Sequence, residues 1–183
     1  MSLYKTFKST TKSQLQKDLW KKNIHQVPEI EKIVVSMGIG SLATRKWMKD
    51  FSELQENLAI ITGQAPHMIY SKKSVSNFKL REGMPVMLRV TLRSKKAYDM
   101  IQRLVTYVFP RIRDFEGISY KKFDGKGNYS MWLKDYGIFP ELNPESIKTP
   151  SWLQITIATT ATSDDDAKAL LESLWVIFQK KQS

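Results

Sequence analysis

The stretch VMLRVTLRSKKAYDMIQRLVTYV, residues 86–108, holds the clearest strand pattern of the chain, followed directly by a helical pattern. Apolar Leu88 and Val90 alternate with Arg89 and Thr91, which predicts a strand with one buried and one polar face. Over residues 97–108 the apolar side chains follow helical spacing, and Pro110 marks the expected end of that helix. The segment therefore predicts a half-buried strand that leads into an amphipathic helix.

Comparable patterns lie on both sides of this segment. Alternation predicts further strands at residues 31–37, 67–70, 129–133 and 153–158. Helical spacing predicts helices at residues 3–23 (basic, and frayed around 9–11), 47–61 (with Gly63 at its end) and 164–178 (capped by Thr162 or Ser163). The apolar side of the 47–61 helix starts at Trp47, and that of the last helix ends at Phe178. We expect turns at Gly38–Gly40 and at residues 123–128.

This order of elements is not the strict alternation of a parallel sheet, so it predicts an α+β fold. We expect a two-layer sandwich in one domain, residues 1–183, with helices on one face of a mostly antiparallel sheet. The second face would carry these side chains: Lys32, Val34, Ser36, Arg89, Thr91, Arg93, Gln154, Thr156 and Thr160. Such a face suits docking on sugar and phosphate, although any solvent-facing sheet tends to be rich in Thr and Lys.

The net charge of +11 is concentrated in one segment. Residues 71–96 contain eight basic side chains and one acidic side chain, Glu82. A solvated lysine-rich loop is the plain alternative, but Arg side chains among the lysines favour phosphate binding. The absence of cysteine excludes a disulfide framework and thiolate metal sites. The sequence also shows no membrane span and no signal peptide, so we expect an intracellular protein with no membrane partner.

No pattern in the sequence predicts an active site, a metal site or a bound cofactor. The stretch GIGSLA, residues 38–43, matches a dinucleotide-binding turn, but it lacks the acidic residue expected about 20 positions later. His25 and His67 are isolated from each other, and the acidic run 164–166 is explained by the positive end of a helix. The predicted open face shows no aromatic stacking signature, so we expect recognition of RNA shape and backbone.

Seven segments then identify a family. They are QVPEIEKIVVSMGIG (26–40), ITGQAP (61–66), KKSVSNFKLREGMP (72–85), VTLR (90–93), FPRIRDFEGIS (109–119), FDGKGNYSM (123–131) and IFPEL (138–142). In this order they closely resemble the universal large-subunit ribosomal protein five in its bacterial or organellar form, over about residues 15–178.

The resemblance implies a non-enzymatic protein of the cytoplasmic or organellar ribosome, in the central protuberance of the large subunit. It implies binding to 5S rRNA and large-subunit rRNA, contact with P-site tRNA and neighbouring 5S-binding proteins, and a bridge to a small-subunit head protein. For rRNA binding it points to Lys32, Ser36, Gln64, Arg89, Thr91 and Arg93. For tRNA binding it points to the loop 71–83, with Lys72, Lys73, Asn77, Phe78, Lys79 and Arg81.

The chain departs from the family pattern at several points. Ser36 stands where Asn is usual, Trp132 stands where Gly is usual, and residues 135–137 and the tail past Leu174 are atypical. Phe78 could anchor the basic loop or stack on an exposed tRNA nucleotide, and we favour the anchor because a lone aromatic is more often packed. Two alternatives remain, which are a free-standing nucleic-acid chaperone and a small dinucleotide-dependent enzyme.

Overall fold

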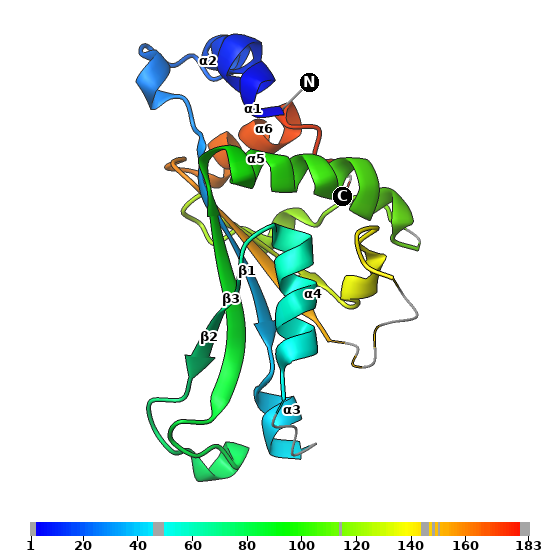
Figure 1. Cartoon of the computed structure of the whole chain (residues 1–183). Helices are drawn as coiled ribbons and strands as arrows, with labels where there is room; N and C mark the ends of the chain where they lie inside the picture. Colours follow the sequence, from blue (N-terminus) through cyan, green and yellow to red (C-terminus); the bar gives the residue numbers. More distant parts are fainter. Residues whose placement is uncertain are drawn as a thin grey trace. The chain divides into compact units, whose positions relative to one another are not determined.

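The structure is a computed structural model that describes residues 3–45, 50–113, 115–143, 147, 149 and 151–179 (Figure 1). Its five strands are β1 (Ile30–Gly38), β2 (His67–Tyr70), β3 (Pro85–Arg93), β4 (Tyr129–Leu133) and β5 (Leu153–Thr159). They form one sheet in the order β2-β3-β1-β5-β4. Each strand lies within one or two residues of its predicted position, and the α+β class is confirmed.

Two pairs of neighbouring strands show the antiparallel arrangement directly. In the β2–β3 hairpin, His67 pairs with Arg89 and Ile69 with Met87. Between β4 and β5, the Thr159 hydroxyl donates to the Gly127 carbonyl at 2.7 Å, and the Ser130 and Thr156 hydroxyls lie 3.1 Å apart. From the first contact to the second, the residue number rises from 127 to 130 on the β4 side and falls from 159 to 156 on β5. The two strands therefore run antiparallel.

The chain divides into two compact units. Unit 1 comprises Met1–Ile33, Leu92–Met131 and Thr156–Ser183, and unit 2 comprises Val34–Thr91 and Trp132–Ile155. Strands β1, β3, β4 and β5 contribute residues to both units. The expectation of one domain over residues 1–183 therefore stays a prediction.

Unit 1 contains the helices from the two ends and the middle of the chain. They are α1 (Leu3–Thr6), η1 (Phe7–Thr11), α2 (Lys12–Asp18), η2 (Ile24–Gln26), α5 (Ser94–Arg103), η4 (Leu104–Val108), η5 (Phe109–Arg111), η6 (Tyr120–Lys122) and α6 (Asp164–Ser173). The buried ring of Phe7 packs 5.1 Å from that of Tyr98, and the Tyr98 hydroxyl accepts a hydrogen bond from the Ile30 amide. Of the two predicted caps of the last helix, Ser163 is the one used, since its hydroxyl accepts from the Asp166 amide at 3.3 Å.

Two predicted helix ends and one predicted local feature in unit 1 are wrong. The first helical region ends at Asp18, because Trp20 adopts a left-handed φ of 52° that a helix cannot continue through. Its segment Phe7–Thr11 is π-helical where we expected fraying. Helix α6 ends at Ser173, and Trp175 has a φ of 68°, so Phe178 lies off the helix in a bridge with Ile118.

Unit 2 contains α3 (Gly40–Arg45), α4 (Ser52–Thr62), η3 (Ser76–Phe78) and η7 (Tyr136–Ile138). The predicted turn at Gly38–Gly40 is wrong in part, since α3 begins at Gly40. The predicted helix from residue 47 begins at Ser52, after Phe51, and Trp47 lies outside the described residues. Its end is confirmed, because Gly63 closes α4 with a φ of 64°.

The core of unit 2 lies between α4 and the apolar side of the strands. Leu54, Leu58 and Ile61 are at most 1% exposed, as are Val35, Met37 and Leu88. Figure 1 shows α4 running alongside β1 and β3. In the same unit, the buried Tyr136 hydroxyl donates to the Thr149 carbonyl at 3.0 Å. One face of these strands is therefore covered by the core, and the alternate side chains point to the opposite face.

Within the described part of the chain, no helix combines the length and apolar character that a bilayer crossing requires.

Candidate nucleic-acid interface

Strand β3 separates its side chains as the sequence predicts. Leu88, Val90 and Leu92 are almost fully buried, while Arg89 is exposed and Thr91 is half-buried. The alternation follows from the two-residue period of a strand whose other face covers a core. Arg89 therefore presents its planar, permanently charged group to solvent, and such a group suits phosphate binding.

Gln64 is brought to β3 by the end of α4. The Thr62 hydroxyl donates to the Leu58 carbonyl at 2.7 Å and lies 3.0 Å from the Gln64 carbonyl, which tightens the turn after the helix. The Gln64 side chain then donates from Nε2 to the Thr91 carbonyl at 3.4 Å. Gln64 is exposed, and its remaining N–H and its Oε1 can bond a sugar or a base edge. The structure thus joins two residues that the resemblance places in the rRNA site.

Ser36 does not lie on an accessible surface. Only 7% of it is exposed, because it has a short side chain on β1, the central strand of the sheet. Neighbouring strands flank it on both sides, so solvent reaches little of the hydroxyl. The expectation of an exposed Ser36 is wrong. Direct contact with RNA there would require the RNA to lie against the backbone of β1.

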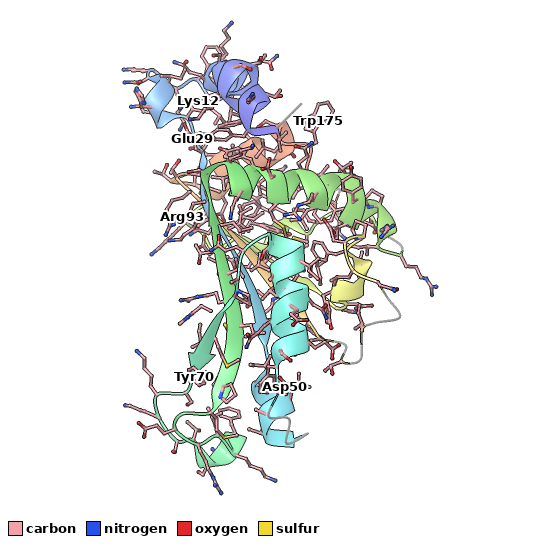
Figure 2. The ribbon with its side chains drawn as sticks, in the orientation of Figure 1. Lys12, Glu29, Asp50, Tyr70, Arg93 and Trp175 are labelled. Atoms are coloured by element: carbon pink, nitrogen blue, oxygen red, sulfur yellow. The ribbon has the colours of Figure 1, made fainter. Side chains whose placement is uncertain are left out.

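Lys32 and Arg93 lie in unit 1 and share one carboxylate. Lys32 Nζ is 3.3 Å and Arg93 Nη1 is 3.7 Å from Glu31 Oε1. Figure 2 shows Arg93 reaching outward from β3. Both contacts are largely exposed, and such pairs contribute little to stability. Sequence reasoning missed Glu31, which leaves this cluster with one net positive charge.

The basic loop 71–83 connects β2 to β3 and is closed at its base by backbone bonds. The Gly83 amide donates to the Ser71 carbonyl at 2.9 Å, and the Ser71 amide donates to the Met84 carbonyl at 2.8 Å. A second bridge pairs Val75 with Leu80 and closes a smaller tip. Figure 2 shows the side chains beyond Tyr70 pointing away from the ribbon. The loop is therefore an ordered, protruding hairpin.

All six loop residues expected to bind tRNA are exposed: Lys72, Lys73, Asn77, Phe78, Lys79 and Arg81. Phe78 is 74% exposed, so its interpretation as an anchor is wrong. It sits in the single turn η3, and Lys79 follows with a φ of 53° that reverses the chain. The tip therefore presents an aromatic ring beside cationic groups, which is the arrangement that stacks on a base.

Two exposed tryptophans also lie in unit 2, although the sequence shows no aromatic stacking signature. Trp132 is 53% exposed on β4, and Trp152 is 59% exposed just before β5. The sequence did not reveal them as a group, because β4 and β5 are neighbours only in the folded sheet.

The glycine-rich turn 123–128 uses its amides internally. Asp164 accepts from the Gly127 amide at 2.9 Å and from the Gly125 amide at 3.2 Å. Asp124 accepts from the Asn128 side chain and from two backbone amides, and these bonds hold its pKa below the usual value. Because carboxylates already occupy these amides, the segment is a turn and not a phosphate cradle, as the sequence predicts.

The GIGSLA segment, residues 38–43, also has a backbone amide bonded within the protein. The Ile39 amide donates to the Val86 carbonyl at 2.9 Å, and a Cβ on Gly40 would lie 3.6 Å from Val86. Helix α3, which follows this segment, has six residues.

In the described residues no group of three or more His, Cys, Asp or Glu side chains is arranged to hold a metal ion.

Comparison with known proteins identifies the family. Residues 23–81 match the model of ribosomal protein L5, and residues 85–178 match the model of the C-terminus of the same ribosomal protein family. The large ribosomal subunit protein uL5 of Natranaerobius thermophilus is 43% identical over 96% of this chain and 97% of its own length. The uL5 of Geotalea uraniireducens is 47% identical over 91% and 92%, and that of Thermotoga maritima is 46% identical over 91% and 89%. The relatives are ribosomal proteins and not enzymes, and the chain belongs to the uL5 family of the large ribosomal subunit.

Proposed function

We propose that this protein binds 5S rRNA and attaches it to the large-subunit rRNA in the central protuberance of a bacterial-type ribosome. The observation that carries the proposal is the Gln64–Thr91 hydrogen bond beside the exposed Arg89. It combines a cation for phosphate with neutral donors and acceptors for sugar and base edges. The bacterial origin of the relatives supports the expected place on a cytoplasmic ribosome.

The charged and the neutral polar residues would have different roles in RNA binding. Arg89 in unit 2 and the Lys32–Arg93 cluster in unit 1 would displace counterions from phosphates and supply affinity. Gln64 and Thr91 would fix the register of the protein on the RNA, since neutral hydrogen bonds depend on distance and direction. Ser36, buried on the central strand, would contribute only if the RNA backbone lies directly on the sheet.

The basic loop would contact P-site tRNA. Its protruding base-closed form and its exposed Lys72, Lys73, Lys79 and Arg81 support a contact at a distance from the sheet. The exposed Phe78 ring would stack on an unpaired tRNA base. Contacts with neighbouring 5S-binding proteins and with a small-subunit head protein are part of the same proposal and rest on the family alone.

Salt dependence of 5S rRNA binding tests the proposal. The slope of log K against log salt should become shallower by about 0.9 in Arg89→Ala or Arg93→Ala, if the duplex value applies. Arg113→Ala, which removes an exposed Arg from a connection in unit 1, is the matched control and should leave the slope unchanged. Unchanged slope and affinity in both test variants would remove β3 from the site.

The same titration separates the alternative functions. A free-standing nucleic-acid chaperone would bind 5S rRNA and an unrelated structured RNA equally well, whereas the proposed function requires a preference for 5S rRNA. The dinucleotide-enzyme alternative has no support from the family, and a thermal-shift screen with nicotinamide and flavin cofactors should show no stabilisation.

A further inference from the structure

Trp132 and Trp152 expose more than half of their area in a unit whose neighbouring strand residues are buried. Trp132 lies between Met131 and Leu133, which are 5% and 3% exposed, and Trp152 precedes Leu153, which is 0% exposed. Alternation therefore turns the Trp132 ring toward the side of the sheet opposite the core, and the Trp152 ring is exposed where the chain enters β5. Large exposed aromatic side chains on one surface usually mark a binding site.

The strand arrangement places Trp132 and Trp152 at the same end of two neighbouring strands, since Trp132 is near the end of β4 and Trp152 comes just before the start of β5. The side-chain contacts Thr159–Gly127 and Ser130–Thr156 run in opposite directions along the two strands, as in an antiparallel pair, and this numbering carried forward would set Trp132 across from Gln154. Trp152 precedes Gln154 by two residues, so the same numbering would make it a diagonal neighbour of Trp132. Diagonal neighbours lie about 7–8 Å apart, within reach of aromatic side chains. All three residues belong to unit 2.

The surroundings of the two rings are polar and cationic. Lys134 is exposed and follows Trp132 by two residues, just beyond the end of β4. The nearest carboxylate along the chain, Asp135, is engaged locally and accepts from the Gly137 amide at 2.8 Å. The same face of unit 2 carries Arg89 on β3. A protein-docking patch would place further apolar groups around the rings, whereas Lys134 and Gln154 match a phosphate and a base edge.

We propose that Trp132 and Trp152 form a platform on which an unpaired base of ribosomal RNA stacks, with Lys134 bound to its phosphate. The inference rests on the proposed rRNA-binding function and adds a contact mode that the basic residues do not provide. Tryptophan rings accept every base, because each base has a π-face, and Gln154 can add a hydrogen bond to the base edge. The platform is thus a local single-strand contact on a protein that otherwise recognises folded RNA.

Binding of 5S rRNA and of deproteinised large-subunit rRNA to purified full-length variants tests the platform. Trp132→Ala and Trp152→Ala should each weaken binding of one of these RNAs by about 5- to 150-fold. The salt slope should stay unchanged, since no phosphate contact is lost, whereas Lys134→Ala should make it shallower. Trp20→Ala, which removes a 91% exposed tryptophan of unit 1, is the matched control.

Conservative variants separate stacking from a structural role. Trp132→Phe should retain most of the affinity and Trp132→Leu should not, because only the first keeps a π-face. Thermal unfolding of the same variants identifies any that fail to fold. Among folded variants, equal RNA affinity of Trp132→Phe and Trp132→Leu would rule out base stacking on Trp132.

The outcomes also separate this inference from the proposed function. Full RNA affinity in the Trp132 and Trp152 variants, with weakened binding in Arg89→Ala, would overturn the platform and keep the function. Full RNA affinity with poor incorporation into large subunits would assign the rings to a protein partner and also overturn it. Equal binding of wild type to all structured RNAs, still reduced by Trp132→Ala, would reject the 5S function while keeping the stacking contact.

Discussion

Gln64 Nε2 donates to the Thr91 carbonyl at 3.4 Å, so the turn that ends α4 is joined to β3. The two residues are 27 positions apart in the chain. The bond holds the exposed Gln64 amide at Thr91, two residues from Arg89 in the chain, and leaves the amide oxygen available as an acceptor.

We expect Gln64→Ala to weaken 5S rRNA binding by about 2- to 10-fold, which corresponds to one net hydrogen bond. The salt slope should not change, because the variant removes no charge. Filter binding over a salt series provides the measurement. Gln55→Ala, on the middle of α4 and away from the turn, is the control. A shallower slope in Gln64→Ala would show that the side chain acts through charge placement and would contradict this assignment.

Replacing Lys72–Arg81 with a short Gly-Ser linker should spare 5S rRNA binding and weaken tRNA placement on assembled ribosomes. The bonds between Ser71 and Gly83–Met84 lie outside the replaced segment, so β2 and β3 should stay paired. The readouts are 5S affinity of the isolated protein and P-site tRNA occupancy of reconstituted ribosomes. Loss of 5S binding by the folded variant would argue against separate roles for loop and sheet.

A full-length loop carrying Phe78→Ala isolates the aromatic contribution. Because Phe78 is 74% exposed, the substitution should leave the free energy of unfolding within about 0.5 kcal/mol of wild type. It should still reduce tRNA occupancy, since a stacked base contributes about 1–3 kcal/mol. Phe78→Tyr should restore occupancy. Destabilisation by Phe78→Ala would instead support the anchor.

The strands could be predicted from sequence because burial of one face imposes a two-residue period, as at Leu88–Leu92. Features that depend on strand order or on register could not. Ser36 is buried because β1 is central, and Trp132 and Trp152 come to the same end of the sheet only because β4 is the neighbour of β5. Gly38 and Gly40 predicted a turn because glycine is a poor helix former, yet α3 starts at Gly40, where a Cβ would already contact Val86.

Gly117→Ala should destabilise the protein far more than Gly125→Ala. Both glycines have positive φ, 115° and 81°, so both substitutions introduce backbone strain of about 1–3 kcal/mol. A Cβ at residue 117 would also lie 2.7 Å from the backbone of Phe178 and Gln179, whereas at residue 125 it meets nothing within 4 Å. Urea unfolding of the two variants gives the comparison, and equal losses would show that the contact with the C-terminal segment relaxes freely.

The free energy of unfolding should fall more steeply with rising alkaline pH in the wild type than in Tyr129→Phe. Burial raises the pKa of Tyr129, whose hydroxyl donates to the Ser119 carbonyl at 3.1 Å. Because the folded-state pKa lies above the unfolded value of about 10, the neutral phenol stabilises the fold fully below pH 10. That contribution is lost as the pH rises from about 10 through the folded-state pKa. Burial raises the pKa of Tyr98 in the same direction.

Tyr129→Phe should lose about 0.5–1.5 kcal/mol at pH 7, where the hydrogen bond is missing, and should then show a flatter decline between about pH 9 and 11. Urea midpoints at half-unit pH steps measure both effects. Tyr107→Phe, on a half-exposed ring outside the core, is the control and should follow the wild-type curve. Parallel declines for wild type and Tyr129→Phe would mean that Tyr129 ionises equally in the folded and unfolded states, which would contradict the complete burial of its ring.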